Sequence, residues 1–234
     1  SDMINNGVTP HLQLSATPSG QCTVLVSADG ERTLCTFLGA ACELGADDLN
    51  EKMFEGYDIF HIEGYLVQNH DLIRTAVKLA KQAGLQVSID LASYNVVEAN
   101  LDFLNEIIRE YVDIVFANEE EAKAFTGKQP EDALIHISEH CDIAVVKIGK
   151  EGSYIKSGEE KVQVKPRLAN CIDTTGAGDL YAAGFLYGLA CGYSLEVCGK
   201  IGSLVSGNVV EVLGAKMTDD VWAEIHAEVK NIVG

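Results

Sequence analysis

The sequence predicts an α/β fold with a mainly parallel central sheet, helices on both faces and a small β hairpin near the N-terminus. Two observations carry this prediction. From residue 58 to residue 149, short and nearly continuous apolar segments alternate with longer helical segments. Strands of this composition are buried on both faces, because helices cover each side of a parallel sheet. The hairpin is predicted from two β-type segments, residues 23–28 and 33–38, that flank the turn DGE.

The predicted elements follow one another in a regular order after the hairpin. Residues 58–64 form a predicted strand, and residues 70–84 form a predicted helix that ends at Gly84. The next predicted elements are strands at 85–91, 113–117 and 144–149, with helices at 96–111 and 119–127 and ahead of residue 144. A hairpin near Gly152 and a strand around Val162 follow, and the remaining chain is predicted to be helical.

Composition limits the class of protein and its partners. The chain has 234 residues, of which 47% are hydrophobic, so it can bury one substantial core. A net charge of −18 argues against nucleic acid and anionic membranes as partners. Seven cysteines without a CxxC spacing favour reduced thiols in a cytoplasmic protein over a disulfide framework. His136, His140 and Cys141 have a helical spacing, which we interpret as exposed helix residues rather than a metal site.

The segment DTTGAGD, residues 173–179, is the most informative in the chain, because it leads directly into an apolar helix. Glycines let the loop curl, and free backbone N–H groups at a helix N-terminus form an anion site. Asp179 lies in the first turn of that helix, where the helix dipole favours an ionised carboxylate. A carboxylate fits this place if a phosphoryl group arrives and Asp179 takes a proton from the attacking hydroxyl. An ordinary loop with a polar N-cap is the alternative.

This segment, with the AGF that follows at 183–185, resembles the second signature of the ribokinase or PfkB family of sugar and nucleoside kinases. Other segments are similar to family motifs in the same order: ADGERT at 28–33, the N-x-x-E segment within 113–127, VVKIGKEGSYI at 145–155 and GAK at 214–216. The resemblance implies a ribokinase-like three-layer sandwich with a small hairpin lid. It also implies one kinase domain over residues 1–234, which uses ATP and Mg²⁺ to phosphorylate a hydroxyl of a small sugar or nucleoside. A homodimer is compatible with it.

The resemblance assigns roles to residues in the signature and in the N-x-x-E motif. Asp179 is the expected general base, and Gly176, Ala177 and Gly178 form the expected anion hole. Asn118 and Glu121 match positions linked to Mg²⁺ and phosphate, and we expect Glu121 to act on the metal through water. The same spacing is also that of a capping box at the start of a helix, so both interpretations stay open.

Further positions match the nucleotide and cation sites of the family, each with a structural alternative. Lys147, Gly149 and Gly152 match a turn that lines the nucleotide, although Thr is more usual than Lys there, and a plain hairpin has the same glycines. Asp173 and Thr175 match positions that hold a monovalent cation in potassium-activated relatives, or they belong to a polar loop. Ser203 lies with Gly202 and Gly207 in a predicted helix at 195–213. These three residues either border the nucleotide base or pack against the preceding helix.

The chain departs from the family pattern in two places. It has no Gly-Gly pair, which the family uses in its sugar-binding signature, and residues 1–12 have the pattern of a helix tail that ends at Gly7. We therefore expect the N-terminal, substrate-binding portion of the family to be absent. After Asp90 the sequence DLASY lacks the Asn and Arg of a family motif.

Two other classes of function remain open at this point. A non-catalytic paralogue that binds a nucleotide or metabolite is opposed by the intact Asp179 and its neighbouring glycines. A nicotinamide-dependent oxidoreductase on a similar sheet is opposed by the missing GxGxxG fingerprint.

Overall fold

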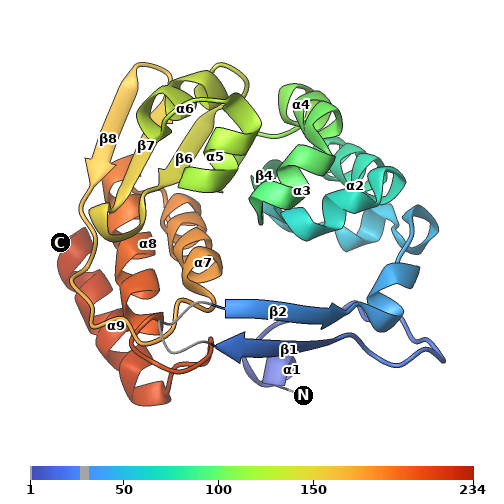
Figure 1. The fold of residues 1–234 in the computed structure, drawn as a ribbon, viewed down its shortest axis with the longest axis horizontal. Helices are drawn as coiled ribbons and strands as arrows, with labels where there is room; N and C mark the ends of the chain where they lie inside the picture. The colour runs from blue at the N-terminus through green and yellow to red at the C-terminus, as the bar shows by residue number, and fades with distance from the viewer. Residues whose placement is uncertain (1, 27–31) are drawn as a thin grey trace.

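The computed structural model describes residues 2–26 and 32–234, which form an α/β fold with two separate sheets (Figure 1). The larger sheet has the order β3-β4-β5-β6-β7-β8. Its strands are β3 (Ile59–Glu63), β4 (Gln86–Asp90), β5 (Ile114–Asn118), β6 (Ile143–Lys147), β7 (Ser153–Ser157) and β8 (Glu160–Val164). Strands β3 to β6 are parallel, and β7 and β8 are antiparallel to their neighbours. The alternation of segments therefore predicted a mainly parallel sheet correctly.

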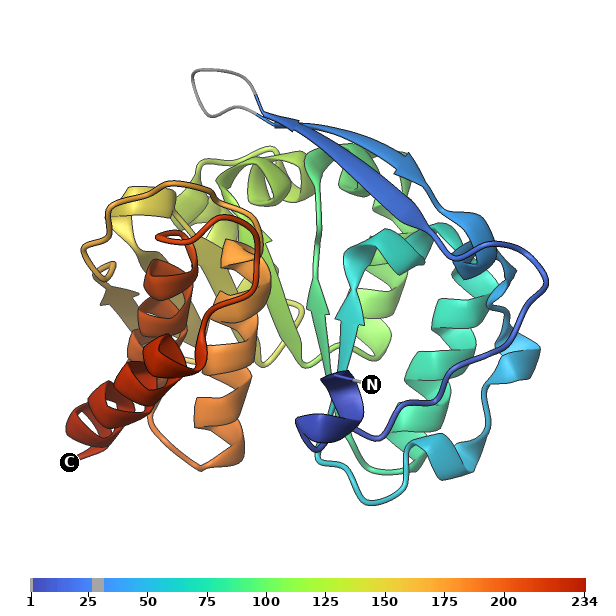
Figure 2. The ribbon, with the colours of Figure 1, turned by 90° about the horizontal axis from the view of Figure 1, so that it is seen from below.

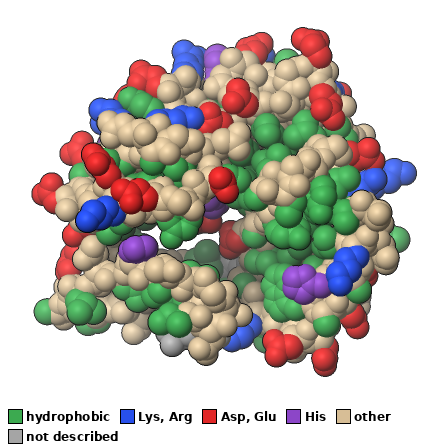
Figure 3. All heavy atoms as spheres, turned by 180° about the vertical axis from the view of Figure 1, so that it is seen from behind, with side chains coloured by type: hydrophobic (Ala, Val, Ile, Leu, Met, Phe, Trp, Pro, Cys, Tyr) green, Lys and Arg blue, Asp and Glu red, His purple; other side chains and the backbone are tan. Residues whose placement is uncertain are grey.

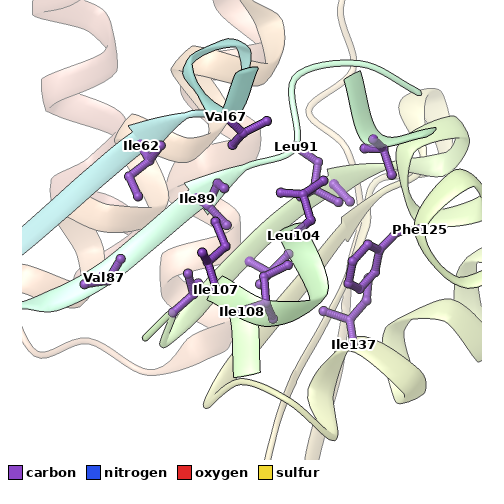
Figure 4. Close-up of a cluster of buried hydrophobic side chains, with 14 of the residues drawn as sticks. Ile62, Val67, Val87, Ile89, Leu91, Leu104, Ile107, Ile108, Phe125 and Ile137 are labelled. Atoms are coloured by element: carbon purple, nitrogen blue, oxygen red, sulfur yellow. The ribbon is translucent and has the colours of Figure 1, made fainter. Parts of the chain in front are cut away.

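One face of this sheet packs against a layer of short helices. These are α2 (His70–Gln82), α3 (Tyr94–Ala99), α4 (Leu101–Glu110), α5 (Glu119–Thr126) and α6 (Pro130–Ser138). Ile62, Val87 and Ile89 point from β3 and β4 into the same cluster as Leu104 of α4 and Phe125 of α5 (Figure 4). The side chains of this cluster are almost completely buried, so it is the main hydrophobic core.

The opposite face packs against the C-terminal helices α7 (Ala177–Ala190) and α8 (Leu195–Val209), and α9 (Asp219–Val233) packs on α8. Ile114, Phe116 and Val145 point to this side, where they meet Tyr181 and Phe185 of α7. Strand residues thus alternate between two buried faces, as the period of two along a strand requires. Their near-continuous apolar sequence follows from this double burial.

The predicted helix at 96–111 is two helices, because the chain breaks at Asn100. Asn100 has φ −128° and ψ 24°, and it ends α3 and precedes α4. Its side-chain Nδ2 donates a hydrogen bond to the carbonyl oxygen of Val96 at 2.9 Å. Asn competes in this way with the backbone for hydrogen bonds, which explains a break that the apolar pattern does not reveal.

The smaller sheet is the predicted N-terminal hairpin, with strands β1 (Gln21–Val26) and β2 (Arg32–Phe37) after a short helix α1 (Asp2–Asn5). Its strands are antiparallel, with Val24 opposite Leu34. They lie apart from the large sheet in two perpendicular views (Figures 1 and 2). Leu25, Leu34 and Phe37 are more than half exposed on it. The predicted turn DGE, residues 29–31, lies outside the described residues.

Short 3-10 segments join several of these elements, at Gly39–Glu43, Ala46–Asp48, Glu51–Met53, Gly64–Gln68 and Gly149–Glu151. Among the helices that the structure describes, none combines the length and the apolar character that crossing a lipid bilayer requires.

Candidate active site

Four neighbouring parallel strands each end in a polar or charged residue. These last residues are Glu63 of β3, Asp90 of β4, Asn118 of β5 and Lys147 of β6. Glu63 is paired with Asp90, and Asn118 with Lys147, in the strand register. All four are in register with the sheet face that carries Phe116, which is the side of α7. Ligand sites of α/β proteins form at the carboxyl ends of the strands. The four side chains therefore mark the edge of the sheet at which a ligand is expected.

The N-terminus of α7 forms the second part of the site. Gly176 is the N-cap residue, with φ 78° and ψ 2°, a left-handed conformation that favours glycine. A Cβ atom at this position would lie 2.8 Å from the Cβ of Ala215, so the loop also needs glycine for its close approach to that residue. A glycine cap has no side chain to accept from the first backbone N–H groups of the helix. The N–H of Ala177 donates to the carbonyl oxygen of Thr174 at 3.2 Å, and the N–H groups of the first turn beyond it can be offered to an anion.

Asp173 fixes the shape of the loop before α7. One carboxylate oxygen accepts hydrogen bonds from the backbone N–H and the hydroxyl of Thr175, at 2.9 and 2.6 Å. The other oxygen accepts from the backbone N–H of Gly214 at 2.9 Å. The predicted signature and the distant GAK segment thus meet in space, with Ala215 packed on Gly176.

Asp179 lies in the first turn of α7, and it is exposed. Although the residue reaches the surface, the protein around it removes part of the water from its carboxylate. This desolvation raises the pKa of Asp179 above its ordinary value, and the carboxylates of Glu63 and Asp90 raise it further. Lys147 and His61 act in the opposite direction on the same pKa. Glu63, Asp90 and Lys147 end β3, β4 and β6, and His61 lies two residues before Glu63 in β3, so the helix and the sheet edge form one site. Seen from behind, the molecule has an opening above the part that carries the hairpin, and acidic side chains lie at its border (Figure 3).

Lys147 and Asp90 form a buried ion pair in this site. The Nζ atom of Lys147 lies 2.5 Å from Oδ2 of Asp90, and the two side chains are 15% and 9% exposed. The other oxygen of Asp90 accepts a hydrogen bond from the backbone N–H of Ala92 at 3.1 Å. Ala92 has φ 64°, and no other non-glycine residue among those described has a positive φ. Backbone strain of this kind gathers at functional sites, and here it lies directly after the strand that ends at Asp90.

Asn118 and Glu121 form the capping box that their spacing allowed. The side-chain oxygen of Asn118 accepts from the backbone N–H of Glu121 at 2.9 Å. The two carboxylate oxygens of Glu121 accept from the backbone N–H and the side-chain amide of Asn118, at 2.7 and 2.6 Å. Glu121 is only 2% exposed, and burial raises its pKa to about 7. The structural interpretation of this motif is confirmed, and its role towards a metal stays a prediction.

Gly149 and Gly152 shape the turn between β6 and β7. Gly152 has φ 103°, and a Cβ atom there would lie 1.9 Å from the carbonyl oxygen of Val164. Gly149 has φ 52°, and a Cβ atom would find only the carboxylate of Glu119 at 3.9 Å. The conformation of the turn and the close approach of Val164 therefore explain why position 152 requires glycine. The space beside Gly149, in contrast, leaves room for a ligand. Neither observation tests a contact with a nucleotide.

Helix α8 ends at Val209, earlier than predicted, and its glycines all face close neighbours. A Cβ atom at Gly202 would lie 2.8 Å from the carbonyl oxygen of Tyr181, and one at Gly207 would lie 2.8 Å from Arg167 Cβ. Ser203 is buried, and its hydroxyl accepts from the backbone N–H of Arg167 at 2.9 Å and donates to the carbonyl of Lys165 at 3.3 Å. Packing thus explains the glycines, and a nucleotide base beside Ser203 stays a prediction.

A second cluster of ligand-type side chains lies far along the chain from this site. One ligand atom each from His136, Glu139 and His140 lies within 4.8 Å of the others, so Glu139 completes this cluster in place of Cys141. The guanidinium of Arg109 lies 3.5 Å from Nε2 of His140. A positive charge so close opposes cation binding, so we assign no function to this cluster.

Sequence reasoning missed two residues of the site, Glu63 and His61. The predicted strand at 58–64 carries them at alternate positions, so they share one face of β3. His61 Nδ1 lies 3.0 Å from the hydroxyl of Ser88 on β4, and its Nε2 lies 3.5 Å from Glu63. Two polar residues at the end of an otherwise apolar strand were the available signal.

Comparison with known proteins connects this geometry with one class of enzyme. Residues 2–220 match the sequence pattern described as "pfkB family carbohydrate kinase". An "Uncharacterized sugar kinase" from Archaeoglobus fulgidus is 29% identical over 204 residues, which are 85% of this chain and 79% of that protein.

Solved structures have the same fold. The adenosine kinase from Sinorhizobium meliloti is 34% identical, with a TM-score of 0.90, over 97% of this chain and 72% of that one. A putative ribokinase II from E. coli, in complex with ATP and Mg²⁺, has a TM-score of 0.78 at 21% identity, over 90% of this chain and 71% of that one. The predicted ribokinase-like arrangement, with a mainly parallel sheet between helical layers and a separate hairpin, is confirmed.

Proposed function

Since this chain belongs to the pfkB family of carbohydrate kinases, we propose that it transfers the γ-phosphoryl group of ATP to a hydroxyl of a small sugar or nucleoside, with Asp179 as general base. One observation carries the assignment of the base. Asp179 lies beside the glycine-capped N-terminus of α7 and faces the charged ends of three parallel strands. A proton acceptor and an anion site thus occur together, as phosphoryl transfer requires.

In this proposal Asp179 orients the acceptor hydroxyl and takes its proton as the hydroxyl oxygen attacks the γ-phosphorus. The bond from the γ-phosphorus to the β,γ-bridging oxygen breaks, and ADP leaves with that oxygen. The backbone N–H groups of Gly176 and Gly178 stabilise the negative charge of the transferred group, together with that of Ala177 once it turns from the carbonyl oxygen of Thr174 to the phosphoryl oxygen. Donors fixed in a helix terminus need no reorganisation during the reaction, which is the source of their effect.

The proposed nucleotide site lies along the ends of β5 and β6, at Asn118, Lys147, Gly149 and Gly152, with Ser203 near the base. Mg²⁺ prefers oxygen donors, and the carboxylate of Glu121 and the side-chain amide oxygen of Asn118 are donors of this kind, so this pair of residues fits the metal. Glu121 would hold it through water, because both of its carboxylate oxygens bind Asn118. Bound Mg²⁺ would neutralise charge on the β- and γ-phosphates. The structure of the putative ribokinase II with ATP and Mg²⁺ supports this combination of ligands.

A monovalent cation is proposed at the loop that Asp173 and Thr175 form. The carboxylate of Asp173 already organises this loop through its bonds to Thr175 and Gly214. A cation here would support the anion site through the same loop. Activity should then rise with K⁺ at fixed ionic strength, and equal rates in K⁺ and in a large organic cation would exclude this part of the proposal.

The acceptor class is sugar or nucleoside, and the described residues act as a single kinase domain in this proposal. The names of the relatives include a sugar kinase and an adenosine kinase, and both acceptors carry a free hydroxymethyl group. An ADP-release assay with MgATP and a panel of sugars and nucleosides tests the proposal. We expect release that depends on one class of acceptor. MgATP binding without release for any acceptor would favour a non-catalytic, nucleotide-binding protein instead.

A further inference from the structure

The ion pair between Lys147 and Asp90 joins two strands that are not neighbours. Lys147 ends β6 and Asp90 ends β4, and β5 lies between them in the sheet. The two residues are 57 positions apart in sequence, and their charged atoms are 2.5 Å apart. Both side chains are largely buried, so water screens the pair much less than it screens an exposed one. The pair therefore holds an ammonium group at a fixed place above the end of β5.

That place is next to the first turn of α7. A Cβ atom on Gly178 would lie 3.2 Å from the Nζ atom of Lys147, so the ammonium borders the loop proposed as the anion hole. The N-terminus of a helix carries a partial positive charge, which repels a cation. A lysine is stable here because Asp90 holds it, and an anion bound between the lysine and the helix would be attracted by both.

Among the described residues, charged groups on three strands act on Asp179. Glu63 and His61 lie on β3, Asp90 on β4 and Lys147 on β6, and each affects its proton affinity. Glu63 and Asp90 favour the protonated carboxyl, whereas Lys147 and His61 favour the ionised form. Glu121 of α5 also experiences the charges of Asp90 and Lys147. The pair is thus placed to influence both the phosphoryl group and its base.

We propose that Lys147 is a catalytic residue, and Asp90 its positioning residue: Asp90 holds the Lys147 ammonium at the first turn of α7, where it contacts the transferred phosphoryl group. This inference rests on the proposed function, because it assumes phosphoryl transfer at α7. Lys147 would thus supply a positively charged side chain to the transferred phosphoryl group, in addition to the backbone N–H groups.

A purely structural ion pair is the competing explanation, and the chain contains a matched example. Lys81 of α2 and Asp113, the residue before β5, form a pair with the same 2.5 Å separation. Asp113 also accepts from the backbone N–H of Val87 at 2.6 Å. This pair lies at the amino end of the parallel strands, opposite to the proposed site, so it is a control for the loss of a lysine–aspartate contact.

The test uses the variants Lys147→Met, Lys147→Arg, Asp90→Asn and the double variant Lys147→Met with Asp90→Asn, with Lys81→Met as the control. Asparagine at position 90 retains an oxygen for the bond from Ala92. Two readouts are measured for each. The first is the pH profile of kcat/KM with MgATP and the best acceptor of the panel. The second needs no acceptor: the ¹³C-carboxyl titration of Asp179 in the free protein, assigned by its loss in Asp179→Asn.

We expect Lys147→Met to lower kcat by about 10²–10³, the range for loss of one preorganised charge donor. It should also move the titration of Asp179 to higher pH, because the ammonium of Lys147 lowers that pKa in the wild type. Asp90→Asn should move that titration to lower pH, and the double variant should bring it back towards the wild-type value without restoring kcat. Lys147→Arg should retain much of the rate because it retains the charge. Lys81→Met should change neither readout.

The inference is overturned if Lys147→Met leaves the Asp179 titration unchanged and kcat within about twofold, as an ordinary structural contact would. If Lys147→Met does not fold, an unchanged titration in Asp90→Asn overturns it equally. Failure of the proposed function looks different. Wild-type protein would then release no ADP with any acceptor, while the titration of Asp179 would still respond to Lys147→Met. That result would support the electrostatic contact between Lys147 and Asp179 and would exclude phosphoryl transfer to the acceptors tested.

Discussion

Asp179 lies among charges of both signs, and their balance sets the pH at which it can act as a base. Burial, Glu63 and Asp90 raise its pKa, and Lys147 and His61 lower it. A general base works best when its pKa approaches the operating pH, provided that it stays ionised. The carboxylates at the ends of β3 and β4 therefore increase the basicity of Asp179, and the ammonium of Lys147 limits that increase.

Replacing Glu63 by glutamine should move the acidic limb of the kcat/KM profile to lower pH. The free enzyme loses activity as pH falls through the pKa of Asp179, because the protonated carboxyl cannot accept the hydroxyl proton. Removing the Glu63 charge lowers that pKa, since Glu63 raises it in the wild type. Glu228→Gln, an exposed change on α9, is the control. An acidic limb that moves upward, or equally in both variants, would contradict this account of the site.

Single residues were predictable from sequence where the chemistry is local. Asp179 and its three preceding residues form one continuous segment, so their arrangement at a helix start followed from the sequence. The contact between Lys147 and Asp90 depends on which strands lie side by side, which no local pattern contains. Glu63 was missed because its only signal was a polar residue at a strand end.

The Asn118–Glu121 motif at the start of α5 is a helix cap in this structure. Glu121 accepts two hydrogen bonds from Asn118, although burial raises its pKa from 4.5 to about 7. The folded protein thus keeps a proton on Glu121 that the unfolded chain releases between these pH values. Glu121 therefore contributes most to the free energy of unfolding below about pH 4.5. This contribution falls by about 3 kcal/mol as the pH rises to about 7.

Glu121→Gln should remove this part of the pH dependence, because an amide stays neutral at every pH. The amide oxygen still accepts a hydrogen bond from Asn118, so the cap is partly retained. Urea unfolding at pH 5 and pH 8 measures the effect as the difference between wild type and variant. We expect the wild type to lose more stability than Glu121→Gln over this interval. The same loss in both proteins would show that Glu121 ionises normally in the folded state.

Helices α7 and α8 approach closely through small residues. A Cβ atom on Gly184 would lie 3.0 Å from the Cα of Gly202, and one on Gly202 would lie 2.8 Å from a carbonyl oxygen of α7. Backbone atoms cannot move aside as a flexible side chain can. The glycines thus set the distance between α8 and the helix that begins at the anion site.

Gly202→Ala should destabilise the protein although alanine is the better helix former. The added methyl group costs about 1–3 kcal/mol by overpacking, against a gain of about 1 kcal/mol in helix propensity. The melting temperature measures the balance, which we expect to be a net loss. Ser206→Ala on the same helix leaves the contact intact and serves as the control. An increase of the melting temperature in Gly202→Ala would show that the helices can separate without cost.

For helices and strands, the sequence predicted the type of each element better than its first and last residues. The hairpin, the parallel strands and the C-terminal helices are present, because each has a clear apolar period. The division of residues 96–111 into α3 and α4 was not predicted, since it depends on the side chain of a single Asn100. The end of α8 at Val209 likewise precedes the last apolar residues of the predicted helix.

The complete site combines two parts of the fold that are distant in sequence. The sheet supplies charged residues at the ends of β3 to β6, and the C-terminal half supplies the glycine-capped start of α7. The fold class and the anion loop were predictable, because alternation and one signature suffice for them. The way in which the loop meets the sheet edge was not, since it depends on the packing of α7 against Phe116 and its neighbours.

In the proposed reaction Asp179 acts on the acceptor and not on the nucleotide, and Asp179→Asn separates these two roles. Asparagine has nearly the same shape but cannot take a proton, and position 179 is exposed, so the fold should be retained. We predict that MgATP raises the melting temperature of the variant as it does for the wild type, while kcat with the best acceptor falls by about 10²–10⁴. A variant with near-normal kcat would contradict the account.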